Sequence, residues 1–368
     1  MNAISIPTMK LLNPGPVTLT ESVRSALAGA DLCHREPEYS ALQRRLADGI
    51  RRVYPAAQDR FEAVLLTGSG TAAVEAMVGS LVPTTGKALV LANGVYGERI
   101  ADMLAMQGKH REVMSHSWDA GIDFDQLSVK LGQDDTISHV ICVHHETTSG
   151  RLNDLARTGR ICKQHGKALL VDAVSSFGAE AIDFEAWGIE AVAATANKCL
   201  HGAPGVSFVL ASRTALQRPS ASRSVYLDLR RHHEAQQAGS VAFTPAVHVC
   251  LALEAALREF FEQGGVEARH RRYAGHMRRL YDGLGARGCF PLIDPVGDRS
   301  VVLSAFRLPE GLTYERLHVH LKAEGFVIYA GQGRFGERFF RVSLMGDLAG
   351  GDVDRLLQAF DSILSLQA

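Results

Sequence analysis

The sequence predicts an α/β protein with a large domain built on a mainly parallel β-sheet and a smaller C-terminal α+β domain. Between residues 60 and 211, short apolar runs alternate with longer segments whose apolar residues recur at helical spacing. After residue 212 the pattern changes to two long helical segments, followed by short strands that alternate with helices. We therefore expect an N-terminal arm (1–20) that contributes to the small domain and to the functional site, a large domain (21–255) and a small domain (256–368).

Six apolar runs are the candidate strands of the large domain. Each is apolar almost throughout rather than alternating, which is typical of parallel strands covered by helices on both faces. The runs cover residues 63–66, 88–92, 139–143, 168–172, 191–194 and 206–211. Helical spacing is found at 72–81, and residues 161–165 close a helix that Gly166 terminates. Ligands of such sheets bind at the carboxyl ends of the strands, so functional residues are expected there.

The C-terminal part begins with a long helix at 245–261, which Gly264-Gly265 ends, and continues with a basic amphipathic helix at 266–284. We expect the basic side chains of the second helix on a solvated outer face, with an anion-binding patch as the alternative. They are Arg269, Arg271, Arg272, Arg278 and Arg279. Further strands are predicted at 301–306, 326–329 and 339–342, with helices at 314–324 and 352–364.

Composition argues against several functional classes. The 368 residues carry a net charge of −1 and no long Lys/Arg run, so nothing favours nucleic acid or an anionic membrane as a partner. No apolar stretch reaches the ~20 residues that span a bilayer, and the first twelve residues lack a secretory signal, so we expect a cytoplasmic protein. The six cysteines form no Cys-x-x-Cys pair and the histidines no ligand spacing, which predicts mostly buried thiols and no metal site.

A glycine-rich segment, Gly68-Ser69-Gly70-Thr71, directly follows the first candidate strand and opens a helix. Exposed N–H groups at such a helix start bind anions, and Ser69 and Thr71 add hydroxyl donors. The segment also fits the dinucleotide pattern G-x-G-x-x-A, but that pattern needs an acidic residue after the next strand, and 88–93 has none. The loop therefore predicts a site for a simple phosphate, with a bare structural turn as the alternative.

Asp172 ends the run at 168–172, and Lys198 follows the run at 191–194. A carboxylate at the end of a buried strand needs a cationic partner, which a pyridinium nitrogen would supply, although a helix N-cap is the alternative. A lysine between an apolar strand and a small-residue loop is poorly placed for a solvated charge, and desolvation lowers the pKa of an amine as imine formation requires. Taken together, the three segments predict a pyridoxal 5′-phosphate site in which Lys198 holds the cofactor covalently and Asp172 faces its ring nitrogen.

Several longer segments carry a resemblance to a known family. GSGTAAVEAM, ANGVYGERI, HHETTSGRLN, VDAVSSFGAEAID, ATANKCLHGAPGVSFVLA and FTPAVHV resemble the class V aminotransferases of fold type I, from LLNPGPVTLT at residue 11 to FRVSLMG near residue 345. The resemblance implies the fold of those enzymes, with a seven-stranded sheet, pyridoxal 5′-phosphate as cofactor, and a homodimer with active sites at the subunit interface. It implies a transaminase that acts on a small amine and a keto acid.

Carried over position by position, the resemblance also assigns individual residues. Tyr96 would stack on the cofactor ring and Thr148 would hydrogen-bond its phenolic oxygen. Thr244 would reach the cofactor phosphate of the neighbouring subunit, and Arg341 would bind the acidic group of the substrate through paired hydrogen bonds. The complete predicted cofactor site consists of Ser69, Gly70, Thr71, Tyr96, Thr148, Asp172, Ser175, Lys198 and Thr244.

Substrate choice is less sharply defined by the sequence. Within the class, the segments are most similar to enzymes that transfer the amino group of 2-aminoethylphosphonate to pyruvate, giving phosphonoacetaldehyde and alanine. Alanine–glyoxylate or serine–pyruvate aminotransferases are the alternative, and a nicotinamide-dependent oxidoreductase built on the glycine-rich loop is a remote one. Three departures bear on the choice: Ala246 replaces a second proline after Thr244, 330–333 replaces a Pro-Gly-Lys-like run, and the loop at 34–39 resembles both groups of aminotransferases.

Overall fold

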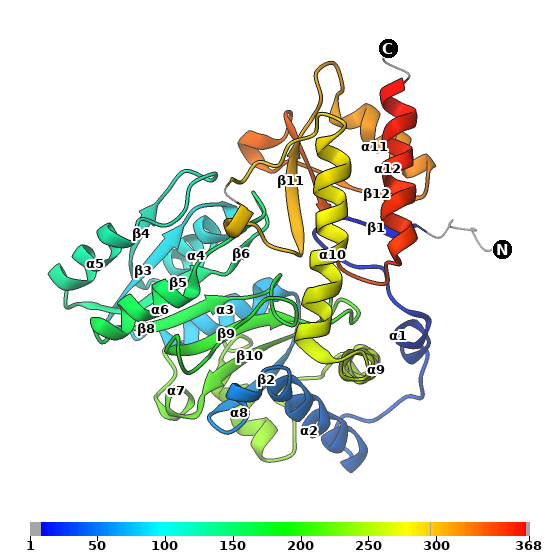
Figure 1. Cartoon of the computed structure of the whole chain (residues 1–368). Helices are drawn as coiled ribbons and strands as arrows, with labels where there is room; N and C mark the ends of the chain where they lie inside the picture. The colour runs from blue at the N-terminus through cyan, green and yellow to red at the C-terminus, as the bar shows by residue number, and fades with distance from the viewer. Residues whose placement is uncertain (1–8, 295, 366–368) are drawn as a thin grey trace.

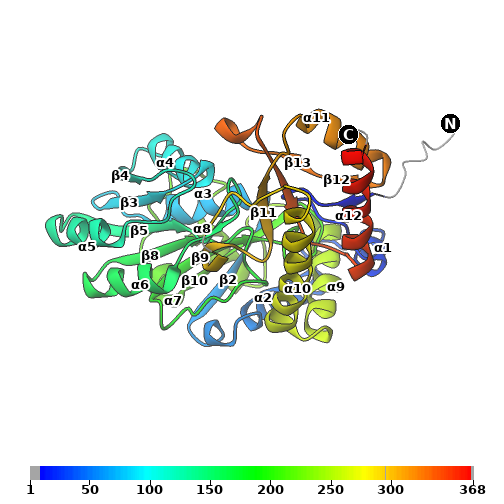
Figure 2. The same cartoon turned by 45° about the horizontal axis from the view of Figure 1, so that its top comes forward.

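The computed structural model describes residues 9–294 and 296–365. Figures 1 and 2 show a broad sheet with helices on both of its faces, beside a second group of strands and helices formed mainly by the C-terminal part of the chain. The long helix α10 (Gly265–Gly285) runs from the first group into the second.

The central sheet has seven strands in the order β2-β10-β9-β8-β5-β3-β4. β10 is antiparallel to both of its neighbours, and the other neighbouring pairs are parallel. The mainly parallel sheet and all six predicted strands are thereby confirmed. The strands are β2 (Phe61–Thr67), β3 (Lys87–Ala92), β4 (His110–Ser115), β5 (Ile137–Val143), β8 (Ala168–Asp172), β9 (Ile189–Thr195) and β10 (Val206–Ser212).

Two apolar cores cover the two faces of this sheet. Leu169 and Val171 of β8 belong to one core and Leu170 to the other, because successive side chains on a strand point to opposite faces. The first core is closed by α2 (Pro37–Arg52), α5 (Phe124–Gln133), α6 (Leu155–Gln164) and α9 (Val247–Glu262). The second is closed chiefly by α3 (Gly70–Leu81) and α4 (Val95–Met106).

The C-terminal part forms its own core and a three-stranded sheet in the order β11-β14-β13. The predicted strand at 326–329 is two short strands, because β12 pairs with β1 in the N-terminal segment while β13 pairs with β14. The division of domains at residues 20 and 255 stays a prediction, and residue 255 lies inside α9. The elements are β1 (Lys10–Leu11), β11 (Leu303–Arg307), α11 (Tyr314–Ala323), β12 (Phe326–Val327), β13 (Tyr329–Ala330), β14 (Phe339–Ser343) and α12 (Gly350–Ser365).

Short elements connect these parts. They are α1 (Glu21–Ala26), β6 (His145–Glu146), β7 (Arg151–Leu152), α7 (Arg213–Gln217) and α8 (Leu229–Gln237), with single 3₁₀ turns at Pro55–Ala57, Val296–Asp298 and Gly333–Phe335.

Five of the six cysteines are buried and Cys33 is exposed, which confirms the interpretation of most of them as small apolar residues. Among the described helices, none is long and apolar enough to cross a membrane.

We expected the basic side chains of α10 on a solvated face, and this prediction is wrong for one arginine. Arg269 is only 3% exposed, and its guanidinium donates to the backbone oxygen of Cys199 and, at 3.1 Å, to Gln263 Oε1. Its guanidinium carbon also lies 5.0 Å from the ring centroid of Phe260. Arg271, two residues further on, follows the expectation with a side chain that is 72% exposed. The first turns of α10 therefore cover the loop that contains Lys198.

We predict that Arg269→Leu lowers the free energy of unfolding by about 1–3 kcal/mol, because the backbone oxygen of Cys199 would lose its charged donor inside the protein. Arg271→Leu, on the exposed side of the same helix, is the matched control and should stay within about 0.5 kcal/mol of the parent. Urea unfolding midpoints measure both changes. Equal midpoints for the two variants would show that the buried guanidinium does not stabilise the fold.

Candidate active site

The carboxyl ends of two neighbouring parallel strands bring together an acid and an amine. Asp172 is the last residue of β8, and Lys198 lies three residues after the end of β9. β8 and β9 are adjacent and parallel, so their carboxyl ends meet at one edge of the sheet. Each group influences the ionisation of the other, which places them in one electrostatic neighbourhood. The sequence-predicted pair is therefore brought together by the fold.

The Lys198 amine is held in a desolvated position. Burial, helped by the positive charge of Arg341, lowers the pKa of this amine to about 8 against the opposing influence of Cys199 and Asp172. Its Nζ donates a hydrogen bond to the backbone oxygen of Pro14. An amine with this pKa has a substantial neutral, nucleophilic fraction near pH 8.

The Asp172 carboxyl is also buried, with 6% of its surface exposed. Burial raises its pKa to about 6, against the opposing influence of a hydrogen bond from the Val174 N–H and of the positive charges of Arg99 and Lys198. Within residues 9–294 and 296–365, the Val174 N–H at 2.9 Å is the one hydrogen bond that the carboxylate accepts. A cationic ring N–H would complete its partners, so this residue fits the pyridinium nitrogen of pyridoxal 5′-phosphate.

The glycine-rich loop opens α3 with unused hydroxyl groups. Ser69 is the N-cap residue of α3, yet its side chain makes no cap hydrogen bond, and Ser69 and Thr71 are both exposed. A Cβ on Gly70 would lie 2.7 Å from a methyl carbon of Val174, so this position requires glycine. The helix start therefore offers N–H and hydroxyl donors to an anion, as the phosphate of the cofactor would require.

The first turn of α4 carries Tyr96 together with an arginine that sequence reasoning missed. The guanidinium carbon of Arg99 lies 4.8 Å from the centroid of the Tyr96 ring, a cation–π contact between residues three apart on one helix. Arg99 also lowers the pKa of Asp172, so its charge acts within the site. The i, i+3 spacing from Tyr96 was the only signal for Arg99 in the sequence.

Thr148 is fully buried, and its hydroxyl is already engaged by the protein. Thr148 Oγ1 donates to Glu146 Oε1 at 2.6 Å and accepts from the Val95 N–H at 3.1 Å. The predicted contact of Thr148 with the cofactor stays a prediction. Glu146 was not predicted from the sequence, although a carboxylate within the buried run from His144 to Ser149 is an unusual feature that could have indicated it.

Arg341 projects from β14 and is 6% exposed. Its guanidinium donates to the backbone oxygens of Ala330 at 2.9 Å and Thr147 at 3.1 Å, and to Gln332 Oε1 at 3.0 Å. Burial lowers the pKa of this arginine. Gln332 was noted in the sequence only as a departure from the family pattern, and the structure gives it a direct contact with Arg341.

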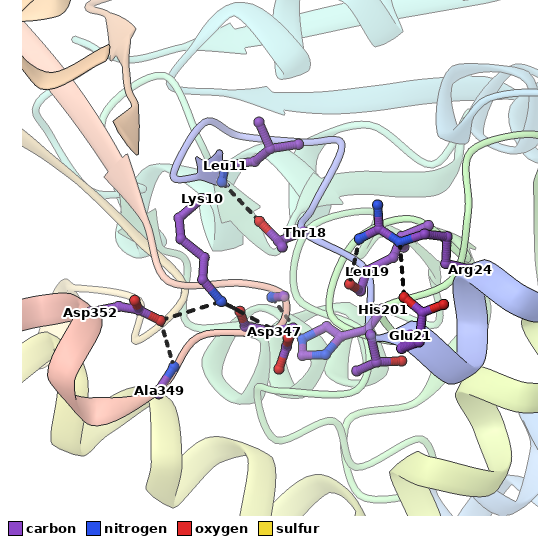
Figure 3. Close-up of polar contacts among 12 residues, drawn as sticks. Lys10, Leu11, Thr18, Leu19, Glu21, Arg24, His201, Asp347, Ala349 and Asp352 are labelled. Atoms are coloured by element: carbon purple, nitrogen blue, oxygen red, sulfur yellow. Dashed lines mark hydrogen bonds and ion pairs between the residues drawn. The ribbon is translucent and has the colours of Figure 1, made fainter. Parts of the chain in front are cut away.

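The N-terminal segment is fastened to the first turn of α12 and to the residues just before it, as Figure 3 shows. Lys10 Nζ donates to the backbone oxygen of Asp347 at 2.7 Å and lies 3.4 Å from Asp352 Oδ2. The Leu11 N–H donates to Thr18 Oγ1 at 2.8 Å, which closes the segment into a loop. Two parts of the chain more than 300 residues apart in sequence are thereby joined.

The closed loop places Pro14 and Gly15 against Lys198. A Cβ on Gly15 would collide with the end of the Lys198 side chain, and Gly15 has a φ of 126°, which favours glycine. The loop after Lys198 also contacts the C-terminal part of the chain, because His201 Nε2 accepts a hydrogen bond from the Gly346 N–H at 2.9 Å. Pro14 and Gly15 were not among the predicted site residues, although the Asn-Pro-Gly-Pro run marks a tight turn.

The remaining predicted residues lie in two different settings. Ser175 is buried beside the site, where its hydroxyl donates to the backbone oxygen of His145 at 3.0 Å. Thr244 is exposed and lines a small cavity with Thr67 and Tyr226 near the end of β2. The predicted roles of both residues remain predictions.

Comparison with known proteins gives a consistent result. Residues 33–356 match the family described as Aminotransferase class-V. The chain is 36% identical to 2-aminoethylphosphonate–pyruvate transaminase of Vibrio cholerae serotype O1, over 97% of this chain and 98% of the relative. The same activity names a relative from Klebsiella pneumoniae, also 36% identical, over 96% of this chain and 97% of the relative. The solved alanine–glyoxylate aminotransferase from Nostoc sp. has a TM-score of 0.92 at 25% identity, covering 99% of this chain and 97% of that one.

We predict that Gly15→Ala reduces the affinity for pyridoxal 5′-phosphate at least about tenfold, because the new methyl group would displace Lys198 or the N-terminal segment. Gly166→Ala is the matched control: Gly166 also has a positive φ, of 64°, but a Cβ there meets no atom within 4 Å. The visible absorbance of the bound cofactor measures affinity, and thermal unfolding measures the backbone cost common to both variants. Equal affinity in both variants would contradict a close fit of Gly15 against the amine.

Proposed function

Because this chain belongs to the class V aminotransferases, we propose that it transfers the amino group of 2-aminoethylphosphonate to pyruvate, forming phosphonoacetaldehyde and alanine. The observation that carries the proposal is a half-buried amine, Lys198, which lies under the electrostatic influence of both Asp172 and Arg341. The identity to transaminases of this activity, over nearly the whole chain, supports the choice of substrates.

Pyridoxal 5′-phosphate is the cofactor that family membership implies, and when bound it supplies an aldehyde that accepts the amino group and a ring that withdraws electrons from the substrate carbon. Asp172 would hold a proton on the ring nitrogen, since its own partners leave room for a cationic N–H. Ser69, Gly70 and Thr71 would bind the phosphate at the start of α3. Tyr96 would cover the ring.

Lys198 would do the acid–base work of the reaction. Its lowered pKa of about 8 allows the amine to accept a proton from the substrate carbon and to return it during the same turnover. A correctly placed general base contributes about 10²–10⁴-fold to the rate. Arg341 and Arg99 add positive charge near the amine and the acid, which favours anionic substrates in the same space.

Arg341 would bind the phosphonate or carboxylate group of the substrate. A guanidinium matches both groups through paired, charge-assisted hydrogen bonds. In this structure the guanidinium donates to two backbone oxygens and to Gln332 Oε1, and substrate would compete with the side-chain acceptor, which is the more easily moved. Gln332 adds no positive charge of its own, so the recognition of the acid rests chiefly on Arg341.

We also propose a homodimer in which Thr244 contacts the cofactor phosphate of the neighbouring subunit. The exposure of Thr244 at the surface of its own chain leaves it free to make such a contact. A cytoplasmic location remains an expectation from the sequence. An alanine–glyoxylate or serine–pyruvate aminotransferase is the second candidate, favoured by the likeness to the Nostoc structure.

A screen of amino donors with pyruvate as acceptor tests the proposed substrates. We expect the highest kcat/KM with 2-aminoethylphosphonate, compared with its hydroxylated analogue, taurine and serine; alanine is assayed with glyoxylate as acceptor, because its exchange with pyruvate gives no net product. Lys198→Ala is the control and should transfer no amino group from any donor, because the amine that moves the proton is lost. Highest turnover with alanine or serine, with glyoxylate as a better acceptor, would support the second candidate instead.

Arg341→Ala should raise the KM for the acidic substrates about 10–100-fold, which corresponds to the loss of a charge-assisted hydrogen-bonded pair. The variant should still bind pyridoxal 5′-phosphate, because the proposed cofactor contacts come from other residues. Arg338→Ala, an exposed arginine close to the same strand, is the matched control and should leave the KM unchanged. Loss of the cofactor with unchanged substrate affinity would overturn the role given to Arg341.

A further inference from the structure

Glu146 and Thr148 form a buried polar pair against the start of α4, the helix that carries Tyr96. Glu146 Oε1 accepts from both the hydroxyl of Thr148, at 2.6 Å, and the Thr148 N–H, at 3.1 Å. The Thr148 hydroxyl in turn accepts from the Val95 N–H, one of the donors that the first turn of α4 leaves unpaired. Glu146 is 0% exposed and Thr148 is 0% exposed, so water does not compete for these contacts.

The second carboxylate oxygen of Glu146 lies in an unusual position. Glu146 Oε2 is buried without a hydrogen-bond partner among the described residues. The carboxyl group lies directly against Gly94, where a Cβ would collide with it, so the chain accommodates this acid by having glycine there. An ionised carboxylate with one unpaired oxygen is costly inside a protein, whereas a protonated one is less so.

The Thr148 hydroxyl has a single proton, so it can donate to only one acceptor at a time. A hydroxyl has one proton and two lone pairs. In the present structure the proton points to Glu146, and one lone pair accepts from Val95. The inference rests on the proposed function and on the contact that the family resemblance implies, in which the phenolic oxygen of the cofactor accepts from this same hydroxyl. Thr148 can then donate to the cofactor only if it stops donating to Glu146.

We propose that Glu146 takes up a proton from solvent when the cofactor binds, and that the neutral carboxyl then donates a hydrogen bond to Thr148 Oγ1, which turns the Thr148 hydroxyl toward the phenolic oxygen. The charge of the Glu146 carboxyl changes from −1 to 0 in this step, and Thr148 Oγ1 then accepts from Val95 and Glu146 while donating to the cofactor. Glu146 is in this sense a positioning residue, which acts on the cofactor through Thr148.

The electrostatic surroundings of Glu146 are compatible with this uptake. Burial, together with the negative charge of Asp172, raises the pKa of Glu146 to about 7, while hydrogen bonds from Thr148 and from the backbone N–H of Gly97 act to lower it. Among the described residues, Arg341 on β14 and Cys142 on β5 also interact electrostatically with Glu146. In the cofactor-free protein the carboxyl is therefore mostly ionised at pH 8 and mostly protonated at pH 5.5. Uptake of a proton on binding is then large at pH 8 and small at pH 5.5.

Proton uptake on binding is measurable without turnover. The probe is pyridoxamine 5′-phosphate, which carries the ring and phenolic oxygen but forms no bond with Lys198, titrated calorimetrically in two buffers with different ionisation enthalpies. The parent protein should take up about one proton more than Glu146→Gln at pH 8, and the difference should fall toward zero at pH 5.5. Equal proton uptake by the two proteins at pH 8 would overturn the proposal.

A second pair of variants keeps the test independent of the folding of Glu146→Gln. Thr148→Ser retains the hydroxyl, so the proton uptake beyond that of Glu146→Gln should persist. Thr148→Val removes the hydroxyl, so this additional uptake should disappear. Full uptake by Thr148→Val would show that the field of the cofactor alone protonates Glu146, which would also overturn the proposal. Failure of the parent protein to bind the probe at all would instead reject the proposed function, so the two failures are distinguishable.

Discussion

The desolvation of one amine is the constraint on which the architecture of the site depends. Removing an ammonium group from water costs several kcal/mol unless it is compensated or loses its charge. Around Lys198, the negative charge of Asp172 partly compensates the ammonium form, while burial and the positive charge of Arg341 favour the neutral amine. Two contacts hold the lysine and its neighbour in place. The Arg269 guanidinium donates to the backbone oxygen of Cys199, and the Lys198 amine donates to the backbone oxygen of Pro14.

Those parts of the fold that follow from burial could be predicted from the sequence. Six strands, including the edge strand β2, are apolar almost throughout, so they stand out as continuous runs, and the chemistry at their carboxyl ends follows from their position. β4 was missed because it is an edge strand whose side chains are mostly exposed, and HREVMS therefore shows no apolar run. The antiparallel direction of β10 leaves no trace in composition, because it is set by how the chain returns across the sheet.

The parts of the site that could not be predicted depend on contacts between distant segments. Arg269 has the sequence surroundings of a surface arginine, and only the crossing of α10 over the loop after Lys198 buries it. Gln332 meets Arg341 only because the segment after β13 returns beside β14. Glu146 bonds to Thr148, two residues along the chain, but its place against Gly94 at the start of α4 depends on tertiary packing. A single sequence indicates which residues are chemically suited to a site, but the partners that tune them are determined by tertiary packing.

The fastening of the N-terminal segment to the first turn of α12 and to the residues just before it has a consequence for how the protein is made. A ribosome synthesises the chain from the N-terminus, and domains generally fold in that order. The central sheet, with Asp172 and Lys198, is complete by residue 212, but Arg341 and the partners of Lys10 emerge more than a hundred residues later. Until then the loop around Pro14 lacks the contacts that Lys10 makes with Asp347 and Asp352. A nascent chain thus completes its sheet, with both Asp172 and Lys198, before it has the later residues that fasten the N-terminal loop beside the amine.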